Sequence, residues 1–331
     1  MTEVDRLLFP VGHGGFAAEA IDHNYLSVID CGSDVCPTRV SMYIDALKRH
    51  GFNCVKRLYI THFDNDHVNC IKELIDKVGV KEVVVPFFPH EMRYVYNTYT
   101  KGAYLELLNL FKENEIELNE INEEKTFRPN PQYDIWEWNV KCLLTDQDWI
   151  ILCKEFKSKN LDINKLTSSK DTDYLNDNRK VINSCFRHVF PNGGPNSKGL
   201  IVLSQKCKDV VTNKCVITHG CSKSLPATNA GCLYTGDANL KNKNNTQAVA
   251  SFVKKRLHEE KMLLTQIPHH GSKYNSNEKF VIFFDSEYYF YCDNTDSRLN
   301  KMLCNNLRSS KQLLDVRDCC MDLIWNQIVL K

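Results

Sequence analysis

The stretch of sequence that decides the fold and the site is Thr61-His62-Phe63-Asp64-Asn65-Asp66-His67. Four of its side chains can bind a metal, and they fall within six residues: His62, Asp64, Asp66 and His67. An apolar, strand-like run over 55–60 precedes it, and a helical pattern follows it. The carboxyl ends of strands are where α/β folds place their sites, and imidazole with carboxylate at this density suits Zn, Mn or Fe. The alternative is a polar helix cap, but a cap needs one carboxylate and not four ligands.

The spacing within this stretch allows two groups of ligands. His62 and Asp64 point the same way from an extended segment, whereas Asp66 and His67 form a second face as the helix begins. Two adjacent metal sites can share such a loop, which is the arrangement used for two-metal hydrolysis.

Two later segments also end apolar strands with polar, chemically active side chains. Thr235-Gly236-Asp237 offers a carboxylate that can bridge two metals, although a strand-terminal Gly-Asp is often only a turn. Pro268-His269-His270-Gly271-Ser272 offers one ligand and one neighbour for substrate or proton transfer, the alternative being surface histidines in a turn. Recurrence favours the functional interpretation, because all three strand ends can converge on one edge of a sheet.

The order of strand and helix patterns predicts a layered α/β domain that spans 1–331. Within the first 90 residues, strands alternate with helices, one of which is expected over 41–50. Residues 91–195 are less regular and are predicted to form an insertion or lid, with 171–180 as a loop. Strands return from residue 199 onward. They are expected at 200–203, 215–217, 232–235, 262–267, 282–284 and 288–292, with a helix over 248–257, an exposed loop over 241–245 and a last strand within 322–330.

Composition excludes several classes of protein. The 331 residues are 43% hydrophobic and 25% charged with a net charge of +1, which is ordinary for a globular enzyme and gives no sign of a nucleic-acid coat or a membrane-surface protein. No run of 18 apolar residues and no signal peptide is apparent. The fifteen cysteines are odd in number and form no C-x-x-C pair, so a reduced, cytoplasmic protein is expected.

The three motif segments together resemble the metallo-β-lactamase-fold hydrolase superfamily. Its H-x-H-x-D-H signature corresponds to His62-x-Asp64-x-Asp66-His67, with Asp64 in place of the second histidine. The T-G-D and H-H-G-S segments match as well, as do two N-terminal segments, Val11-Gly12-His13-Gly14 and Val28-Ile29-Asp30-Cys31-Gly32. The set is most similar to the branch that includes the hydrolase domain of bacterial competence DNA-uptake channel proteins. The resemblance covers roughly residues 5–90 and 196–275.

This resemblance implies a four-layer αββα sandwich with a partly helical insertion and a metal centre at one edge. Carried over by position, His62 and Asp64 hold the first metal. The second is held by Asp66, His67 and His269, with Asp237 bridging the two. His269 is favoured as the ligand because the last histidine of the family usually stands two residues before the glycine. His270 then lies close by with a catalytic role, and Asp66 also orients the attacking water.

Two departures from the family pattern bear on the metal. An oxygen donor at Asp64 shifts the preference from Zn towards Mn, with Mg as a further option. The isolated middle histidine of the superfamily has no clear counterpart: His188 and His219 are candidates, and Asn196-Ser197 matches the segment that the competence branch often has instead. One or two divalent ions per chain are therefore expected. His13 either lines the site or only serves its turn.

The leading functional hypothesis is a metal-dependent hydrolase that acts on a phosphodiester, as a nuclease or a nucleotide phosphodiesterase. The resemblance to the competence branch and the oxygen-rich ligand set motivate it. An ester, thioester or lactone hydrolase of the same fold is the alternative. A non-catalytic binding or regulatory module that keeps the fold is a third hypothesis, which the completeness of the ligand set disfavours. The expected partner is a phosphodiester substrate, with no membrane; protein partners and oligomeric state stay open.

Overall fold

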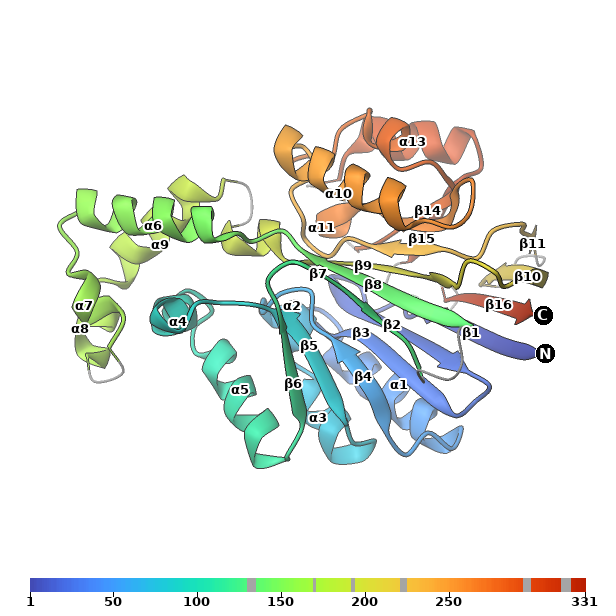
Figure 1. The fold of residues 1–331 in the computed structure, drawn as a ribbon, viewed down its shortest axis with the longest axis horizontal. Coiled ribbons are helices and arrows are strands. Elements are labelled where there is room, and N and C mark those ends of the chain that lie inside the picture. The colour runs from blue at the N-terminus through green and yellow to red at the C-terminus, as the bar shows by residue number, and fades with distance from the viewer. Residues whose placement is uncertain (130–134, 169–170, 192–193, 221–224, 294–298, 317–322) are drawn as a thin grey trace.

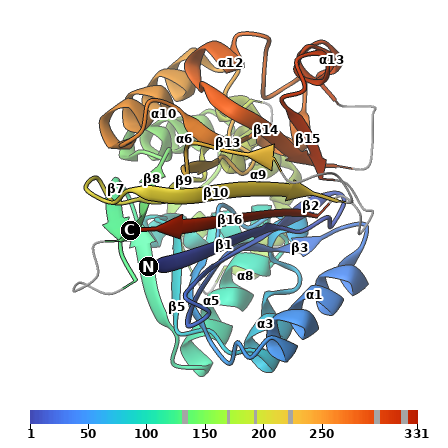
Figure 2. The same cartoon turned by 90° about the vertical axis from the view of Figure 1, so that its right-hand side faces the viewer.

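The protein is built from two β-sheets that pack face to face, with helices on both outer faces (Figures 1 and 2). The computed structural model describes residues 1–129, 135–168, 171–191, 194–220, 225–293, 299–316 and 323–331. In Figure 2, α1, α3 and α5 cover one sheet and α10, α12 and α13 cover the other. The four-layer αββα arrangement expected from the sequence is confirmed.

The first sheet has nine strands in the order β11-β10-β16-β1-β2-β3-β4-β5-β6. From β11 to β3 neighbouring strands are antiparallel, and from β3 to β6 they are parallel. The N-terminal strand therefore pairs with the C-terminal one, and both ends of the chain lie together (Figure 1). The strands are β1 (Thr2–Leu8), β2 (Gly14–Ile21), β3 (Tyr25–Ser33), β4 (Val55–Tyr59), β5 (Glu82–Pro86), β6 (Glu117–Ile121), β10 (Thr212–His219), β11 (Leu225–Pro226) and β16 (Ile324–Leu330).

The second sheet has seven strands in the order β15-β14-β13-β12-β9-β8-β7. Its strands β12 to β15 are parallel, and β7, β8 and β9 are antiparallel. Both sheets thus contain a parallel set whose carboxyl ends can carry a site. The strands are β7 (Glu124–Phe127), β8 (Trp136–Cys142), β9 (Leu200–Lys206), β12 (Cys232–Tyr234), β13 (Met262–Gln266), β14 (Ser286–Cys292) and β15 (Leu313–Val316).

The helices fall into two outer layers and a lobe that projects to one side. The lobe comprises α6 to α9, which extend beyond the sheets on the left of Figure 1. The helices are α1 (Pro37–Arg49), α2 (Asn65–Val68), α3 (Ile71–Lys77), α4 (Arg93–Tyr99), α5 (Ala103–Glu113), α6 (Asp146–Ser158), α7 (Ile163–Leu166), α8 (Thr172–Asp177), α9 (Arg179–Val189), α10 (Lys243–Arg256), α11 (Pro268–Gly271), α12 (Phe280–Phe283) and α13 (Lys301–Ser309), with 3₁₀ turns η1 (His90–Met92) and η2 (Gly194–Lys198).

A buried ion pair lies between the two sheets, within an otherwise apolar core. The Arg6 guanidinium on β1 donates to the Glu19 carboxylate on β2 at 2.7 Å, and neither side chain is exposed. The same carboxylate accepts hydrogen bonds from four side chains of the second sheet: Trp136 at 3.4 Å, Trp138 at 2.7 Å, Ser204 at 2.5 Å and Tyr234 at 2.9 Å. Because buried charges are tolerated only when paired and hydrogen-bonded, this network ties one sheet to the other.

Several sequence-predicted elements are confirmed, and three are wrong. The run 282–284, expected as a strand, lies at the end of the short helix α12 and beyond it. The polar segment 171–180, expected as a loop, contains α8 and the start of α9. The Asn/Lys-rich segment 241–245 was expected as an exposed loop, but Asn242 caps α10 by accepting from the backbone N–H groups of Asn244 and Asn245.

The segment 91–195 contributes to the body of the domain as well as to the lobe. Its strands β6, β7 and β8 pair within the two sheets, so the expectation of an insertion or lid concerns only the helices that project beyond them. Within the lobe α6 packs against α9, and α4, which lies outside the lobe, also packs against α9. Whether they act as a lid stays a prediction, as does the assignment of 1–331 to one domain.

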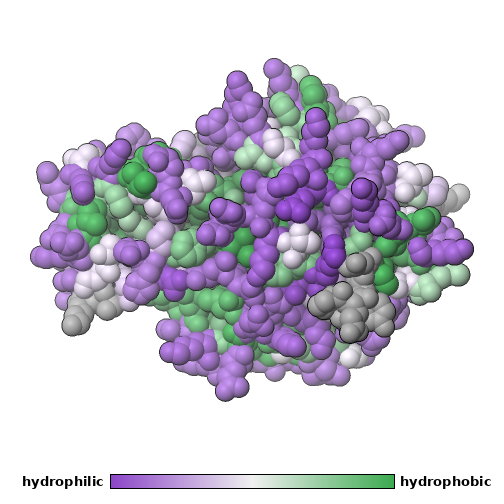
Figure 3. Space-filling view, in the orientation of Figure 1, coloured by the Kyte–Doolittle hydropathy of each residue, from purple (hydrophilic) through white to green (hydrophobic). Residues whose placement is uncertain are grey.

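No described helix is long and apolar enough to cross a bilayer. The face shown in Figure 3 is mostly hydrophilic, with apolar side chains in small groups. The twelve cysteines among the described residues are all free thiols.

Candidate metal centre

The predicted site residues gather at one edge of the sandwich, where parallel strands of both sheets end. The loop after β4 carries His62 and Asp64 and leads into the short helix α2, which begins at Asn65. From the second sheet, Asp237 follows β12 and His269 and His270 follow β13. His62, Asp66, His67, Asp237 and His270 are all buried. The convergence expected from the three motifs is therefore observed.

Asp30 organises this edge through a bulge in β3. The register between β2 and β3 shifts at this point, since Phe16 pairs with Cys31 and Ala17 with Ile29, so Asp30 is the extra residue. Its φ of 54° lies in the left-handed region. The bulge turns its carboxylate towards the β4 loop, where it accepts from the Thr61 backbone N–H at 2.7 Å, the Thr61 hydroxyl at 2.8 Å and His67 Nδ1 at 2.8 Å.

Three histidines have their Nδ1 atoms held by an acceptor, which leaves Nε2 to face the site. His67 Nδ1 donates to Asp30, and His270 Nδ1 donates to the Cys292 carbonyl at 2.8 Å. The Thr61 hydroxyl already donates to Asp30, so at 3.0 Å it accepts from His62 Nδ1. In its neutral form, each of these imidazoles therefore presents the lone pair of Nε2. This is the arrangement of metal-binding histidines, whose other ring N–H is held by a carboxylate, carbonyl or similar acceptor.

The carboxylate of Asp237 faces these Nε2 atoms at distances that suit a cation held between them. Asp237 Oδ1 lies 3.5 Å from His67 Nε2 and 3.7 Å from His270 Nε2, and Asp237 Oδ2 lies 3.6 Å from His62 Nε2. These separations are longer than hydrogen bonds of 2.7–3.2 Å. They approach the spacing of about 3.3 Å expected between ligands that surround one ion tetrahedrally at 2.0–2.1 Å.

Several buried atoms of the site find no hydrogen-bond partner among the described residues. They are Nε2 of His62, Nε2 of His67, Oδ1 of Asp237 and Nδ1 of His269. Buried polar atoms are otherwise almost always paired, so a group of unpaired ones that face each other calls for a bound species. The donor set separates into two groups of two imidazoles and one carboxylate, which are His62, His67 and Asp237, and His13, Asp66 and His270. These residues fit one or two divalent transition-metal ions.

Burial and mutual charge shift the pKa values of the site. Burial and the neighbouring His67 lower the pKa of His62 to about 4, so this imidazole is neutral and able to bind a metal. Burial and the charges of Asp237 and Asp66 raise the pKa of Asp64 to about 7. Burial opposes protonation of His67, but Asp66 and Asp30 raise its pKa well above the usual value. A divalent cation would supply the positive charge that these carboxylates otherwise draw onto the imidazoles.

The chain passes through two strained residues to place the histidine pair. His269 and His270 have φ values of 50° and 55°, and Gly271 follows with 79°. Left-handed conformations of this kind cost roughly 1–2 kcal/mol per non-glycine residue. The His269 N–H donates to the Gly236 carbonyl at 2.9 Å, which fixes the turn to the loop that carries Asp237. Consecutive strained residues of this kind concentrate at functional sites.

Comparison with known proteins finds distant structural similarity only. No protein-family model matches the chain, and no curated protein matches it. It is similar to MEM-A1, a subclass B3 metallo-β-lactamase from a soil metagenome library, at 10% identity over 78% of each chain with a TM-score of 0.35. It is also similar to CmlA, a diiron β-hydroxylase from Streptomyces venezuelae, at 10% identity and a TM-score of 0.47. The alignment with CmlA covers 94% of this chain but 52% of CmlA, about half its length.

These comparisons assign no activity to the chain. MEM-A1 bears the name of the family that the sequence motifs resemble, whereas CmlA is named for a different chemistry. The architecture rests on the two sheets themselves, and the function has to be argued from the site. The specific likeness to the competence branch stays a prediction.

The two adjacent histidines occupy different positions. His270 is buried, its Nδ1 is held by Cys292, and its Nε2 lies 3.0 Å from Asp66 Oδ2. The side chain of His269 is 21% exposed, and its Nε2 lies 3.7 Å from Asp237 Oδ2. Both therefore reach the site, and in His270 an acceptor holds Nδ1 while Nε2 faces the carboxylates.

The candidates for the missing middle histidine lie elsewhere. His188 is on α9, 73% exposed and paired with Glu155, and His219 Nε2 bonds to the Asp315 carbonyl at 2.9 Å. Instead, Asn196 is buried beside Asp64, where its amide favours the charged form of the carboxylate. Asn196 Oδ1 accepts from the Tyr96 hydroxyl at 3.1 Å. The Asn196-Ser197 segment thus supplies a polar side chain at this end of the site, and no histidine.

Sequence reasoning missed the roles of Asp30 and Asp293 and left His13 undecided. One signal was present in the glycines next to Asp30. A Cβ on Gly15 would lie 2.7 Å from His67 Nδ1, and one on Gly32 would lie 2.7 Å from the Val68 backbone nitrogen. Because these glycines on β2 and β3 have no side chain, α2 can pack closely against the two strands. Such a close approach at a glycine is typical of a functional segment.

Proposed function

We propose that this protein is a metal-dependent hydrolase and that its substrate is a phosphodiester, either a nucleic acid or a nucleotide. The observation that carries the proposal is the group of buried, unpaired imidazole and carboxylate atoms around Asp237. Asp237 faces histidines of both donor groups through its two oxygens, as a carboxylate shared by two cations would. Two-cation sites are used by phosphatases and nucleases.

The residues fit the cations as follows. His62, His67 and Asp237 form one donor group, to which Asp64 belongs by its place in the loop. Asp66 and His270 form the core of the other, and Asp237 is shared. When bound, divalent ions supply a water of lowered pKa and stabilise negative charge on a phosphoryl oxygen. We assign His270 to metal binding and the partly exposed His269 to contact with substrate, which exchanges the roles expected from the sequence.

The chain's own groups account for orientation and protonation. Asp30 and the Cys292 carbonyl fix two imidazoles in the tautomer that presents Nε2. Asp66, beside His270, is placed to orient an attacking water as well as to bind a cation. The carboxylates at Asp64, Asp66 and Asp237 make the set richer in oxygen than an all-histidine site. This composition supports Mn or Zn, with Mg as a further option, and supports phosphodiester over ester chemistry.

The test is metal analysis paired with a substrate panel. The protein loaded with Mn or with Zn is assayed on single-stranded DNA, RNA, cyclic nucleotides and bis(p-nitrophenyl) phosphate, alongside an ester and a lactone. Asp66→Ala and Asp237→Ala should bind less metal and lose at least 100-fold in activity. His188→Ala, a histidine on the surface of α9, is the matched control and should change neither. Cleavage of only the ester or lactone would refute the phosphodiester assignment in favour of the second hydrolase hypothesis.

The same measurements separate an enzyme from a binding module that has kept the fold. A non-catalytic module binds metal or ligand but turns over none of the panel. Equal metal content and equal activity in wild type, Asp66→Ala and Asp237→Ala would show that the site itself is wrongly assigned. We also propose a reducing, cytoplasmic setting and a place in the competence-like branch; the free thiols of the described cysteines support the first.

A further inference from the structure

His13 lies in the turn between β1 and β2, and its backbone is fixed by the end of β3. The Ser33 hydroxyl donates to the Val11 carbonyl at 2.6 Å, and the Asp34 N–H donates to the His13 carbonyl at 3.0 Å. The turn is therefore held on the side where β3 also supplies Asp30. These hydrogen bonds fix the backbone of His13 at the edge of the metal centre, so its side chain is held close to the site.

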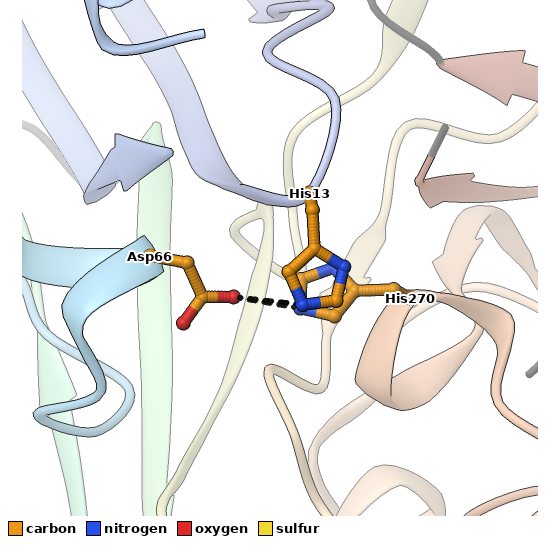
Figure 4. A group of neighbouring side chains, drawn as sticks. All are labelled: His13, Asp66 and His270. Carbon is orange, nitrogen blue, oxygen red and sulfur yellow. Dashed lines mark hydrogen bonds and ion pairs between the residues drawn. The ribbon is translucent and has the colours of Figure 1, made fainter. Parts of the chain in front are cut away.

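The ring of His13 lies between two carboxylates and against another imidazole. Its Nε2 is 3.5 Å from Asp66 Oδ2, and its Nδ1 is 3.4 Å from Asp293 Oδ1. Its ring centroid lies 4.0 Å from that of His270. Figure 4 shows His13 and His270 side by side, with Asp66 facing both. The His13 side chain is 25% exposed, whereas His270 is buried beneath it.

This environment has the same pattern as the other histidines of the centre. In His62, His67 and His270, Nδ1 has an acceptor outside the donor group and Nε2 faces Asp66 or Asp237. His13 has Asp293 at Nδ1 and Asp66 at Nε2. The Nε2 separation of 3.5 Å from Asp66 is too long for a good hydrogen bond and close to the spacing of two ligands on one ion.

We propose that His13 is a ligand of the cation held by Asp66 and His270, and that Asp293 orients its imidazole. This inference rests on the metal centre of the proposed function. The consequence is a donor group of two imidazoles and one carboxylate for that cation. Such a group selects Zn, Mn or Fe over Mg or Ca, because imidazole is a poor ligand for the harder ions. The two cation positions then share one donor composition, although they draw on different segments of the chain.

The test measures metal binding without substrate. The metal-free protein is titrated with Co²⁺, and binding is followed by its visible absorption and by calorimetry, for wild type, His13→Ala, His13→Gln and Asp293→Asn. His188→Ala serves as the control. The His13 variants should lose at least 10-fold in affinity for one equivalent of Co²⁺ and change its absorption spectrum, and Asp293→Asn should lose about 10-fold. Circular dichroism and thermal melting of each metal-free variant establish that it folds, and His13→Gln keeps a polar side chain if His13→Ala does not.

The outcomes separate this inference from the proposed function. Unchanged Co²⁺ affinity and spectrum in folded His13 variants would overturn the inference, and a fall in turnover alone would then place His13 against the substrate. If wild type binds two equivalents of Co²⁺ and the His13 variants bind one tightly, the inference holds even if no phosphodiester is cleaved. If wild type binds no Co²⁺, both the inference and the proposed function fail.

Discussion

Replacing Asp30 with asparagine should weaken metal binding by removing the carboxylate that orients His67, while the fold stays intact. Asparagine tolerates the left-handed φ of 54° at this position and keeps the size of the side chain. The carboxylate, however, accepts three hydrogen bonds, two from Thr61 and one from His67. An asparagine has only one oxygen, so its amide N–H groups must face a donor that Asp30 now satisfies.

Two responses are open to the variant, and both weaken metal binding. If the amide oxygen stays on Thr61, His67 Nδ1–H loses an ionic hydrogen bond worth about 1.5–3 kcal/mol. If His67 instead moves its proton to Nε2, its Nδ1 can accept a hydrogen bond from the amide N–H that the substitution introduces. Nε2–H then points at Asp237, 3.5 Å away, and can no longer bind a cation. Loss of such an orienting partner typically lowers metal affinity 10–100-fold.

The assay combines urea unfolding of the metal-free protein with Co²⁺ titration. The expected result for Asp30→Asn is a 10–100-fold loss of Co²⁺ affinity with a loss of unfolding free energy of no more than about 3 kcal/mol. Asp22→Asn is the matched control, because Asp22 also has a left-handed φ, of 48°, but accepts a single bond from the Glu3 N–H at the surface. Wild-type Co²⁺ affinity in Asp30→Asn would refute the role assigned to the bulge.

Gly15→Ala places a methyl 2.7 Å from His67 Nδ1 and should lower Co²⁺ affinity at least 10-fold by calorimetry, whereas Gly231→Ala, where the nearest atom is 3.3 Å away at the tip of a leucine, should not. Glu19→Gln should cost about 3–5 kcal/mol in urea unfolding at pH 7. Burial raises the pKa of Glu19, but Arg6 outweighs it and lowers this pKa, so the ion pair stabilises the fold above the unfolded-state pKa of glutamate. The difference in unfolding free energy between wild type and Glu19→Gln should therefore narrow as the pH falls below about 4. A difference that is independent of pH would contradict the role given to this ion pair. Chelation with EDTA should lower the melting temperature and added Mn²⁺ should restore it, because a cation that binds only the folded chain stabilises it; an unchanged melting curve would count against a resident metal.

The sequence predicts the sheet cores well because their signals are local. The apolar runs at 200–203 and 262–267 correspond to β9 and β13, and the strand-to-helix passage at 55–67 corresponds to β4, its loop and α2. The start of β1 is harder to predict, because the strand begins at Thr2 and its first five residues include only one apolar side chain, Val4. Arg6 interrupts the apolar alternation of β1, and its burial depends on Glu19, which lies on another strand. From the local sequence alone, a charged residue is predicted to be exposed, even where an ion-pair partner on another strand allows it to be buried.

The candidate ligands could be found from the sequence because each motif is short, but the side chains that orient them could not. His13 meets Asp293 across 280 residues, and His67 meets Asp30 across 37. Asp293 has no sequence signal beyond its place after a strand, and the only signal for Asp30 is the pair of glycines, Gly15 and Gly32, that lie beside it. Asp30 reaches its place only through a bulge, which the spacing of apolar residues does not reveal. The choice between His269 and His270 had the same limit, because it depends on the left-handed turn and on the Cys292 carbonyl that receives His270 Nδ1–H.

The two ends of the centre differ in how firmly they hold their ligands. Both ends hold the Nδ1 atoms of their imidazoles on acceptors, but only at the His270 end does a carboxylate, that of Asp66, also lie within hydrogen-bond distance of a histidine Nε2. At the Asp64 end, the neighbouring buried side chain is Asn196, whose neutral amide is a weaker ligand than imidazole. We therefore expect the two metal equivalents to bind unequally, with the weaker one at Asp64. In a Co²⁺ titration, Asp64→Ala should remove the weaker step and leave the tighter one, whereas His270→Ala should remove the tighter step. Loss of the tighter step in Asp64→Ala would reverse this order.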